Sequence, residues 1–271
     1  MYWLLILSGF LFAGPLQVTE PVVSQFEDGP ALPTGQKLVP GETIFFRFEA
    51  ANFRTSESGK VQLTGHAQVF DPRGTPVAPP DEVAIATSLR EEDKDWKPRF
   101  RSQFQLPAIA PPGTYRIRFD ALDMQTRQKA SGESSFEVEG ADVPPSQQLI
   151  IRKIAFYRGQ DDEAPLKIAA YRPGEAVWVR FDITGYKYAP QNAIDVTYDV
   201  AVSNAAGKQL FAQENAAVER SQAFYPQPWV PGIFSLSLQP NTAPGTYAIT
   251  VTARDAVGKQ TVAERAEFRV E

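Results

Sequence analysis

Few residues of this chain could do acid-base or nucleophilic chemistry. His66 is its one histidine, and it has no cysteine. A serine-histidine-aspartate triad or a histidine-bound zinc would have to use His66, while thiol catalysis, structural disulfides and cysteine-bound zinc are excluded. His66 lies within 61–70, where apolar and polar residues alternate, and no Gly-x-Ser-x-Gly turn accompanies it. We expect His66 on the solvent face of a strand and assign no catalytic residue.

Paired carboxylates are the second kind of chemistry to consider, because two of them can hydrolyse a glycoside. Asp120 and Asp123 are close in sequence, and Asp255 ends a similar apolar run later in the chain. An aspartate at the end of a strand commonly accepts hydrogen bonds from the backbone of the turn that follows. We therefore interpret Asp123 and Asp255 as turn-capping residues and predict that the protein is not an enzyme.

Two acidic clusters, 91–95 and 161–163, offer oxygen ligands that a hard cation such as calcium would accept. Neither cluster has the alternating spacing of an EF-hand loop. The sequence therefore favours solvated loops and predicts no metal site and no cofactor, with calcium binding at these loops left open as the alternative.

Aromatic residues gather in the second half of the chain and give the best candidate for a binding surface. Segment 224–229 reads Phe-Tyr-Pro-Gln-Pro-Trp, and its tryptophan has a counterpart in Trp96. Presence in both halves favours a packing role for the tryptophan, but proline-stiffened aromatic loops also lose little side-chain entropy on binding. The candidate binding residues are Phe224, Tyr225, Trp229, Tyr186 and Tyr188.

The charge of the chain argues against a nucleic-acid partner. The sequence holds 27 Lys and Arg against 32 Asp and Glu, a net charge of −5, and neither half carries a basic excess. A protein that binds a phosphate backbone needs a concentration of basic residues to displace its counterions. We therefore predict no nucleic-acid partner.

The elements that position these residues follow from an internal repeat, in which 40–139 and 173–271 are the same domain written twice. The motifs recur in the same order: Pro-Gly-Glu at 40–42 and 173–175, Trp-x-Pro at 96–98 and 229–231, and Pro-Gly-Thr-Tyr at 112–115 and 244–247. The offset is 133 residues up to the tryptophan and 132 after it, so one residue was gained or lost in between. A match of this length in strict order indicates duplication.

Short alternating runs separated by Pro and Gly predict that each copy is an all-β, antiparallel β-sandwich. The segments 84–95 and 214–223 are expected to carry a turn or two of helix within loops. The predicted organisation is a signal-like segment at 1–14, a first sandwich at 15–139, a proline-rich linker at 140–148 and a second sandwich at 149–271.

The N-terminal residues indicate the cellular compartment of the protein. Met1 to Ala13 is an almost unbroken apolar run followed by a small residue, Gly14. It is shorter than the roughly 17–25 apolar residues that cross a bilayer, and it fits the apolar region of a secretory signal, although no Lys or Arg precedes it. The alternative is a buried first strand. We expect export to the periplasm or the cell exterior, with a mature chain that starts near Gly14 or Pro15 and has no transmembrane span.

Two phrases resemble a known family. Residues 171–180 and 244–251 resemble the strand openings of bacterial immunoglobulin-like domains, including the macroglobulin-type domains of envelope proteins. The first copy departs from the pattern at Leu38, where the counterpart of Tyr171 is absent, and without cysteine no thioester motif exists. The resemblance implies two tandem immunoglobulin-like antiparallel β-sandwiches that serve as a structural or binding module of an exported protein.

The sequence thus predicts a non-enzymatic structural or adaptor module of the bacterial cell envelope, with a role such as adhesion. Its partner would be an envelope or surface protein, bound through the aromatic loop of the second copy, an exposed sheet edge, or both. The alternative is a carbohydrate-binding protein whose Tyr225 and Trp229 stack on the sugar rings of a glycan.

Overall fold

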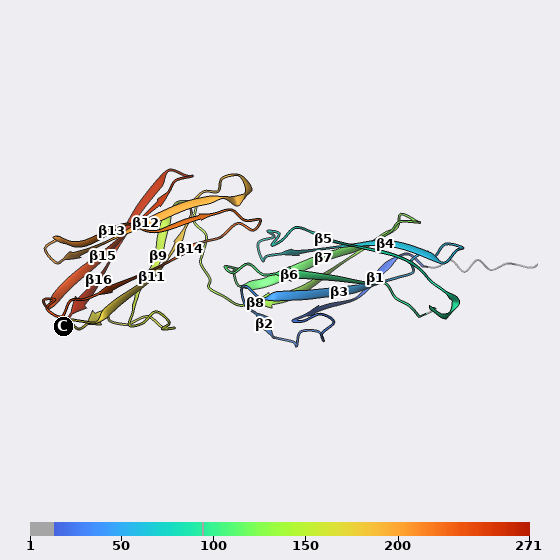
Figure 1. Cartoon of the computed structure of the whole chain (residues 1–271), viewed down its shortest axis with the longest axis horizontal. Coiled ribbons are helices and arrows are strands. Elements are labelled where there is room, and N and C mark those ends of the chain that lie inside the picture. The colour runs from blue at the N-terminus through green and yellow to red at the C-terminus, as the bar shows by residue number, and fades with distance from the viewer. Residues whose placement is uncertain (1–13, 94) are drawn as a thin grey trace, which may run out of the picture. The chain divides into compact units, whose positions relative to one another are not determined.

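The computed structural model describes residues 14–93 and 95–271, and these are built from strands (Figure 1). The chain divides into two compact units, Met1–Gly140 and Ala141–Glu271. The segment 1–13, which carries most of the expected signal, lies outside the described residues. Within the described part of the chain, no helix is long and apolar enough to cross a membrane.

Unit 1 is a sandwich of two sheets. A three-stranded sheet has the order β1-β3-β6, and a five-stranded sheet has the order β2-β8-β7-β4-β5. All pairs are antiparallel except β2 with β8. The elements are β1 (Gln17–Ser24), β2 (Lys37–Leu38), β3 (Thr43–Ala51), β4 (Lys60–Phe70), β5 (Asp81–Ser88), the 3-10 turn η1 (Glu91–Asp93), β6 (Arg99–Gln105), β7 (Gly113–Asp123) and β8 (Lys129–Val138).

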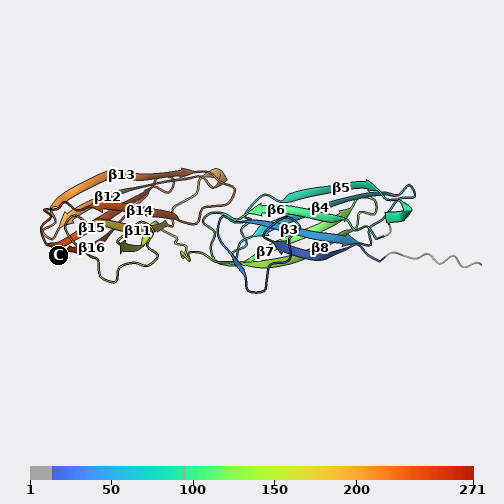
Figure 2. The same ribbon diagram turned by 60° about the horizontal axis from the view of Figure 1, so that its bottom comes forward.

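Unit 2 repeats this arrangement strand for strand (Figure 2), with sheets ordered β14-β11-β9 and β10-β16-β15-β12-β13. Its elements are β9 (Ile150–Tyr157), β10 (Ala170–Tyr171), β11 (Ala176–Thr184), the 3-10 turn η2 (Pro190–Asn192), β12 (Ile194–Asn204), β13 (Gln209–Ser221), β14 (Val230–Ser237), β15 (Gly245–Asp255) and β16 (Gln260–Val270). The predicted pair of all-β sandwiches is therefore confirmed.

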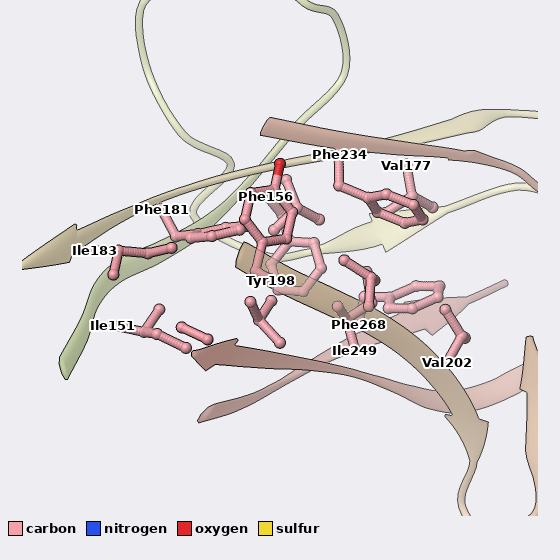
Figure 3. Packing of buried hydrophobic residues seen from close by; sticks show 14 of the residues in the cluster. Ile151, Phe156, Val177, Phe181, Ile183, Tyr198, Val202, Phe234, Ile249 and Phe268 are labelled. Carbon is pink, nitrogen blue, oxygen red and sulfur yellow. The ribbon is translucent and has the colours of Figure 1, made fainter. Parts of the chain in front are cut away.

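The core of each unit lies between its two sheets, because alternate residues of every central strand face inward. In β4 every second residue from Val61 to Val69 is buried, while the residues between them face outward. In unit 2 (Figure 3) aromatic rings from both sheets meet, with 5.0 Å between the ring centroids of Phe181 on β11 and Tyr198 on β12. Burial of each such side chain contributes about 1.5–3 kcal/mol to folding.

A buried tyrosine explains why Pro-Gly-Thr-Tyr occurs in both copies. The hydroxyl of Tyr115 donates to the carbonyl oxygen of Pro111 at 2.9 Å, and that of Tyr247 donates to the carbonyl oxygen of Ala243 at 2.7 Å. Each tyrosine stands near the start of a strand and ties it to the backbone four residues upstream. This is the tyrosine corner typical of immunoglobulin-like sandwiches, so the motif is a device of the fold.

Several tyrosines should make the fold sensitive to alkali. Burial raises the pKa of Tyr171 to about 12, and burial also raises the pKa of Tyr115, Tyr186 and Tyr198. The pKa values of these tyrosines in the folded protein exceed the unfolded value of about 10. Their contribution to stability is therefore complete below pH ~10, and for Tyr171 it is lost as the pH rises through about 12. We expect absorbance at 295 nm to show that these four buried tyrosines ionise only together with unfolding of the fold, above pH ~10.

Ionisation of all nine tyrosines near pH 10, with the strand signal in circular dichroism intact, would contradict the expectation.

The expected helical turns are wrong in most of their length. Residues 84–88 belong to β5 and only η1 follows, while 214–221 belong to β13. Both strands lie at the edge of a five-stranded sheet and pair on one side only. Their faces are therefore half exposed, and the alternation of apolar and polar residues that reveals a strand is weak.

Candidate binding surfaces

Two loops that the sequence treats separately meet at one end of unit 2. The hydroxyls of Tyr186 and Tyr188, in the loop after β11, both donate to the carbonyl oxygen of Gln227, in the loop before β14, at 2.5 and 2.6 Å. The amide of Asn192 donates to the carbonyl oxygen of Phe224 at 2.6 Å. The five candidate residues thus belong to one hydrogen-bonded pair of loops.

Further contacts hold these loops in one shape. The side-chain amide of Gln227 donates to the carbonyl oxygen of Trp229 at 3.1 Å. Gln191 and Asn192 have φ values of 61° and 55°, in the left-handed region that costs non-glycine residues roughly 1 kcal/mol or more. Because the hydrogen bonds of Asn192 maintain this conformation, the tip of the loop is held rigid rather than free to rearrange.

The structure divides the candidate residues into a buried and an exposed set. Trp229, Tyr186 and Tyr225 retain only 5%, 5% and 8% of their surface. Phe224 and Tyr188 remain 48% and 42% exposed. The buried rings pack beneath the loops, so only Phe224 and Tyr188 present substantial area to a partner, and a sugar has no free ring face on Tyr225 or Trp229 on which to stack.

Lys187 ties the first of these loops to the rest of unit 2. Lys187 is exposed between the two tyrosines, and its ammonium group donates to the carbonyl oxygen of Gln147 at 2.9 Å. Its backbone N–H donates to the buried carboxylate of Asp255 at 2.9 Å. Both contacts of Lys187 therefore help to fix the loop that carries Tyr186 and Tyr188.

The aromatic surface is a property of the second copy alone. At the equivalent end of unit 1, Phe53 stands where unit 2 has Tyr186, and it meets Trp96 edge-on with ring centroids 5.8 Å apart. Thr55 stands where unit 2 has Tyr188. The architecture of the fold therefore does not require the exposed rings of unit 2.

A second feature, which sequence reasoning missed, is an open groove of about 560 Å³ on the outer face of unit 1 over β4, β7 and β8. His66 lies in it, with Nδ1 3.1 Å from Asp120 and Nε2 3.5 Å from Glu82. Arg118 contacts Glu133 at 3.2 Å. These residues come together because of the register in which β4, β5, β7 and β8 pair. The register cannot be read from a single sequence, so the groove could not be predicted.

The groove confirms that His66 faces solvent on the outer side of β4. A triad would need one imidazole nitrogen on a carboxylate and the other on a nucleophilic hydroxyl. Here Nδ1 faces Asp120 and Nε2 faces Glu82, so both nitrogens lie against carboxylates. The geometry supports an exposed polar network, which includes the ion pair of Asp120 with Lys129 at 3.1 Å, and exposed ion pairs contribute little to stability.

The two acidic loops use carboxylates to cap their own backbone. Asp162 accepts hydrogen bonds from the backbone N–H groups of Arg158 and Gly159 at 3.1 and 2.9 Å. Asp93 accepts one from the N–H of Arg90 at 2.9 Å. Over residues 14–93 and 95–271, no group of three or more His, Cys, Asp or Glu side chains is arranged to hold a metal ion.

The fold and these surfaces define a class: a tandem pair of immunoglobulin-like β-sandwiches. No family model and no curated protein matches the sequence. Solved structures that match the chain weakly include the C-terminal domain of the Streptococcus agalactiae antigen I/II polypeptide BspA. That match is 10% identical with a TM-score of 0.31, and covers 94% of this chain and 100% of that chain.

Two further matches are partial. The Pseudomonas fluorescens alkylpurine DNA glycosylase AlkC is 14% identical with a TM-score of 0.31 over 46% of this chain and 30% of its own. The E. coli alpha-2-macroglobulin is 10% identical with a TM-score of 0.28, over 94% of this chain and 17% of its own. This chain thus spans less than a third of either protein, and at these scores the likenesses carry no argument about function.

Proposed function

We propose that the protein is a non-enzymatic adaptor of the cell envelope that binds a partner protein through the aromatic surface formed by Tyr188 and Phe224. One observation carries the proposal: two large rings stay exposed on loops that are held rigid by hydrogen bonds to backbone carbonyls. Exposed aromatic residues on a rigid frame are the usual anchors of protein interfaces. The exported location rests on the apolar segment 1–13.

The rigidity of the loops makes the surface effective for its size. Binding normally costs about 0.5–1.5 kcal/mol for each side chain that becomes ordered. Tyr188 is already fixed by its hydrogen bond to Gln227, and the backbone of Phe224 by its bond to Asn192. More of the free energy gained by burying the two rings is therefore retained as affinity.

The surface favours a protein over a sugar because of which rings it exposes. A saccharide site needs a ring face flanked by polar groups that bind hydroxyls. Tyr225 and Trp229, the rings first considered for stacking, are buried, and the hydroxyl of Tyr188 is directed to Gln227. What remains is a small apolar patch that suits an apolar pocket or ridge on another protein.

Removal of the two rings should greatly weaken partner binding. We expect the double variant Tyr188→Ser/Phe224→Ser to lose at least 30-fold in affinity, because each anchor typically contributes about 1–2 kcal/mol or more and every 1.4 kcal/mol is tenfold. The measurement is affinity capture from native envelope extract, followed by calorimetric titration of the recovered protein in purified form.

Phe26 supplies a matched control, since it is another phenylalanine with 59% of its surface exposed, on unit 1. Phe26→Ser should bind as the unaltered protein does. Equal affinity of the double variant and the control would refute the proposal. Loss of binding to a glycan array, rather than to a protein, by the same double variant would show that Tyr188 and Phe224 bind a carbohydrate instead.

A further inference from the structure

β5 is the edge strand of the five-stranded sheet in unit 1, and in Figure 2 it runs along the margin of that unit. It pairs with β4 in an unbroken antiparallel register from Asp81 opposite Ala67 to Ser88 opposite Lys60. An edge strand of this regularity presents a row of unpaired backbone groups on its free side, which can template pairing with another strand.

The register tells which backbone groups of β5 point away from β4. The N–H of Leu89 donates to the carbonyl oxygen of Gly59 at 2.8 Å, while the carbonyl of Lys60 is turned to Ser56 on the other side. Because N–H and C=O groups alternate in direction along an antiparallel strand, the odd-numbered residues of β5 bond to β4. The residues directed to the free side are Glu82, Ala84, Ala86 and Ser88.

The composition of β5 does nothing to block its free side. From Val83 to Ser88 the strand reads Val-Ala-Ile-Ala-Thr-Ser, with no charge, proline or glycine. Short segments with high β-propensity and no charge pair readily with other strands. Proteins usually blunt such edges with charges, prolines or bulges.

The other long edges of the described residues carry such devices. In β14 the groups that face away from β11 include Pro231, which has no N–H, and the carbonyl of Ile233, which accepts the Tyr198 hydroxyl at 3.0 Å. In β6 the residues whose backbone groups face away from β3 include Arg99 and Arg101. Each of these two edges is therefore unsuited to an added strand.

Bulges interrupt three further edge strands. β13, the counterpart of β5, has two register shifts against β12, carries Asn215 at φ 48°, and bears Glu214, Glu219 and Arg220. β1 and β9 each have one register shift, at Glu20 and Lys153 with φ of 50° and 56°. β5, in contrast, is regular along its whole length, and its residues from Val83 to Ser88 carry no charge.

We propose that β5 pairs antiparallel with β5 of a second copy of this chain, about a two-fold axis at Ile85. This register sets Ala84 opposite Ala86 and Glu82 opposite Ser88. Every backbone group that faces the free side then meets one from the partner, as an isologous dimer interface requires. The two five-stranded sheets become one continuous sheet.

The charges of β5 are compatible with a second copy in this register. The acidic residues of β5, Asp81 and Glu82, stand at its N-terminal end, and the residues at its C-terminal end are neutral up to Leu89. Antiparallel pairing about Ile85 sets Asp81 of each copy opposite Leu89 of the other, and Glu82 opposite Ser88. Directly opposed like charges, which destabilise paired strands, are avoided.

The absence of cysteine from the chain makes the register testable with single introduced thiols. Ile85 of the two copies would form a non-hydrogen-bonded pair with Cα atoms about 4.5 Å apart, within disulfide range. Val83 would lie opposite Thr87, so two Val83 positions would be about 13 Å apart, beyond that range. Under mild oxidation, Ile85→Cys should form a covalent dimer at least tenfold faster than Val83→Cys.

Mass measurement of the unaltered full-length protein completes the test. Light scattering should give twice the chain mass of 30.0 kDa. Ala86→Pro removes one N–H from the free side only, as an edge strand tolerates, and should restore the monomer. If that variant misfolds, Ala84→Lys/Ala86→Lys, which sets Lys opposite Lys, should do the same. A monomeric unaltered protein, or equal cross-linking of Ile85→Cys and Val83→Cys, would overturn the proposal.

Discussion

Gly65→Ala should lower the free energy of unfolding of unit 1 by about 2–3 kcal/mol, the cost of forcing extra volume into a packed core. Gly65 lies on the inner face of β4, and a Cβ atom added there would lie 2.3 Å from the Cδ1 atom of Phe100. Phe100 belongs to β6 in the facing sheet, so the ring cannot withdraw without disturbing its stack on Phe48, 4.8 Å away. Equilibrium unfolding in urea, followed by circular dichroism, measures the loss.

A smaller partner should rescue this variant. In Gly65→Ala/Phe100→Leu the added methyl group occupies space that the ring has vacated. The double variant should therefore lose about 1–2 kcal/mol less than the sum of the two single variants, the coupling typical of residues in contact. Strict additivity of the two losses would show that Gly65 is not a site of close packing.

The repeat supports this interpretation of Gly65. In the second copy the glycine and the aromatic ring have exchanged strands. Strand pairing sets Phe100 opposite Phe48 in unit 1, and Gly232 opposite Phe181 in unit 2. The position of Gly65 is taken by Tyr198, whose hydroxyl reaches β14 at the carbonyl of Ile233. One aromatic ring thus fills the space between the sheets in both units, from opposite sheets.

Motifs with a local physical cause were predictable from the sequence. Pro-Gly-Thr-Tyr indicated a strand start, and the structure adds the hydroxyl bond of Tyr115 that explains it. Asp123 was interpreted as a turn cap, and its carboxylate accepts hydrogen bonds from the N–H groups of Gln125 and Thr126 at 2.8 and 3.3 Å. In such cases the partner atoms lie within a few residues of each other, so the sequence contains the interaction.

Features that depend on strand pairing were not predictable from one sequence. The contacts of Tyr186 and Tyr188 with Gln227 join residues about 40 positions apart in two loops. Neither loop contains a signal for the other. The first strands of the units, β1 and β9, carry bulges at Glu20 and Lys153 that interrupt their alternation. Burial of Trp229 likewise follows from how the loops fold over it.

Asp255→Ala should lower the free energy of unfolding of unit 2 by about 3 kcal/mol and weaken partner binding as well. The Asp255 carboxylate is 1% exposed and accepts hydrogen bonds from the N–H groups of Lys187 and Gly258 at 2.9 and 3.0 Å and from the Gln260 amide at 3.2 Å. Loss of a buried charged acceptor leaves these donors unsatisfied, at about 1–3 kcal/mol each before relaxation. Urea unfolding measures the first effect, and calorimetry with the captured partner the second.

The effect on binding follows from the position of Lys187. It lies between Tyr186 and Tyr188, so the bond from its N–H to Asp255 fixes the backbone that presents the exposed ring of Tyr188. Without that anchor the loop gains conformational freedom, which must be lost again when the partner binds. We expect a fall in affinity of about tenfold even under conditions where unit 2 remains folded.

Asp123 provides the matched control in unit 1. Its buried carboxylate accepts a hydrogen bond from the N–H of Arg54 at 2.8 Å, as Asp255 does from Lys187 in unit 2, but that loop presents no counterpart of Tyr188. Asp123→Ala should therefore destabilise unit 1 by a similar amount and leave partner affinity unchanged. Equal loss of affinity in both variants would mean that binding depends on general stability, and the aromatic surface would lose its role as the contact site.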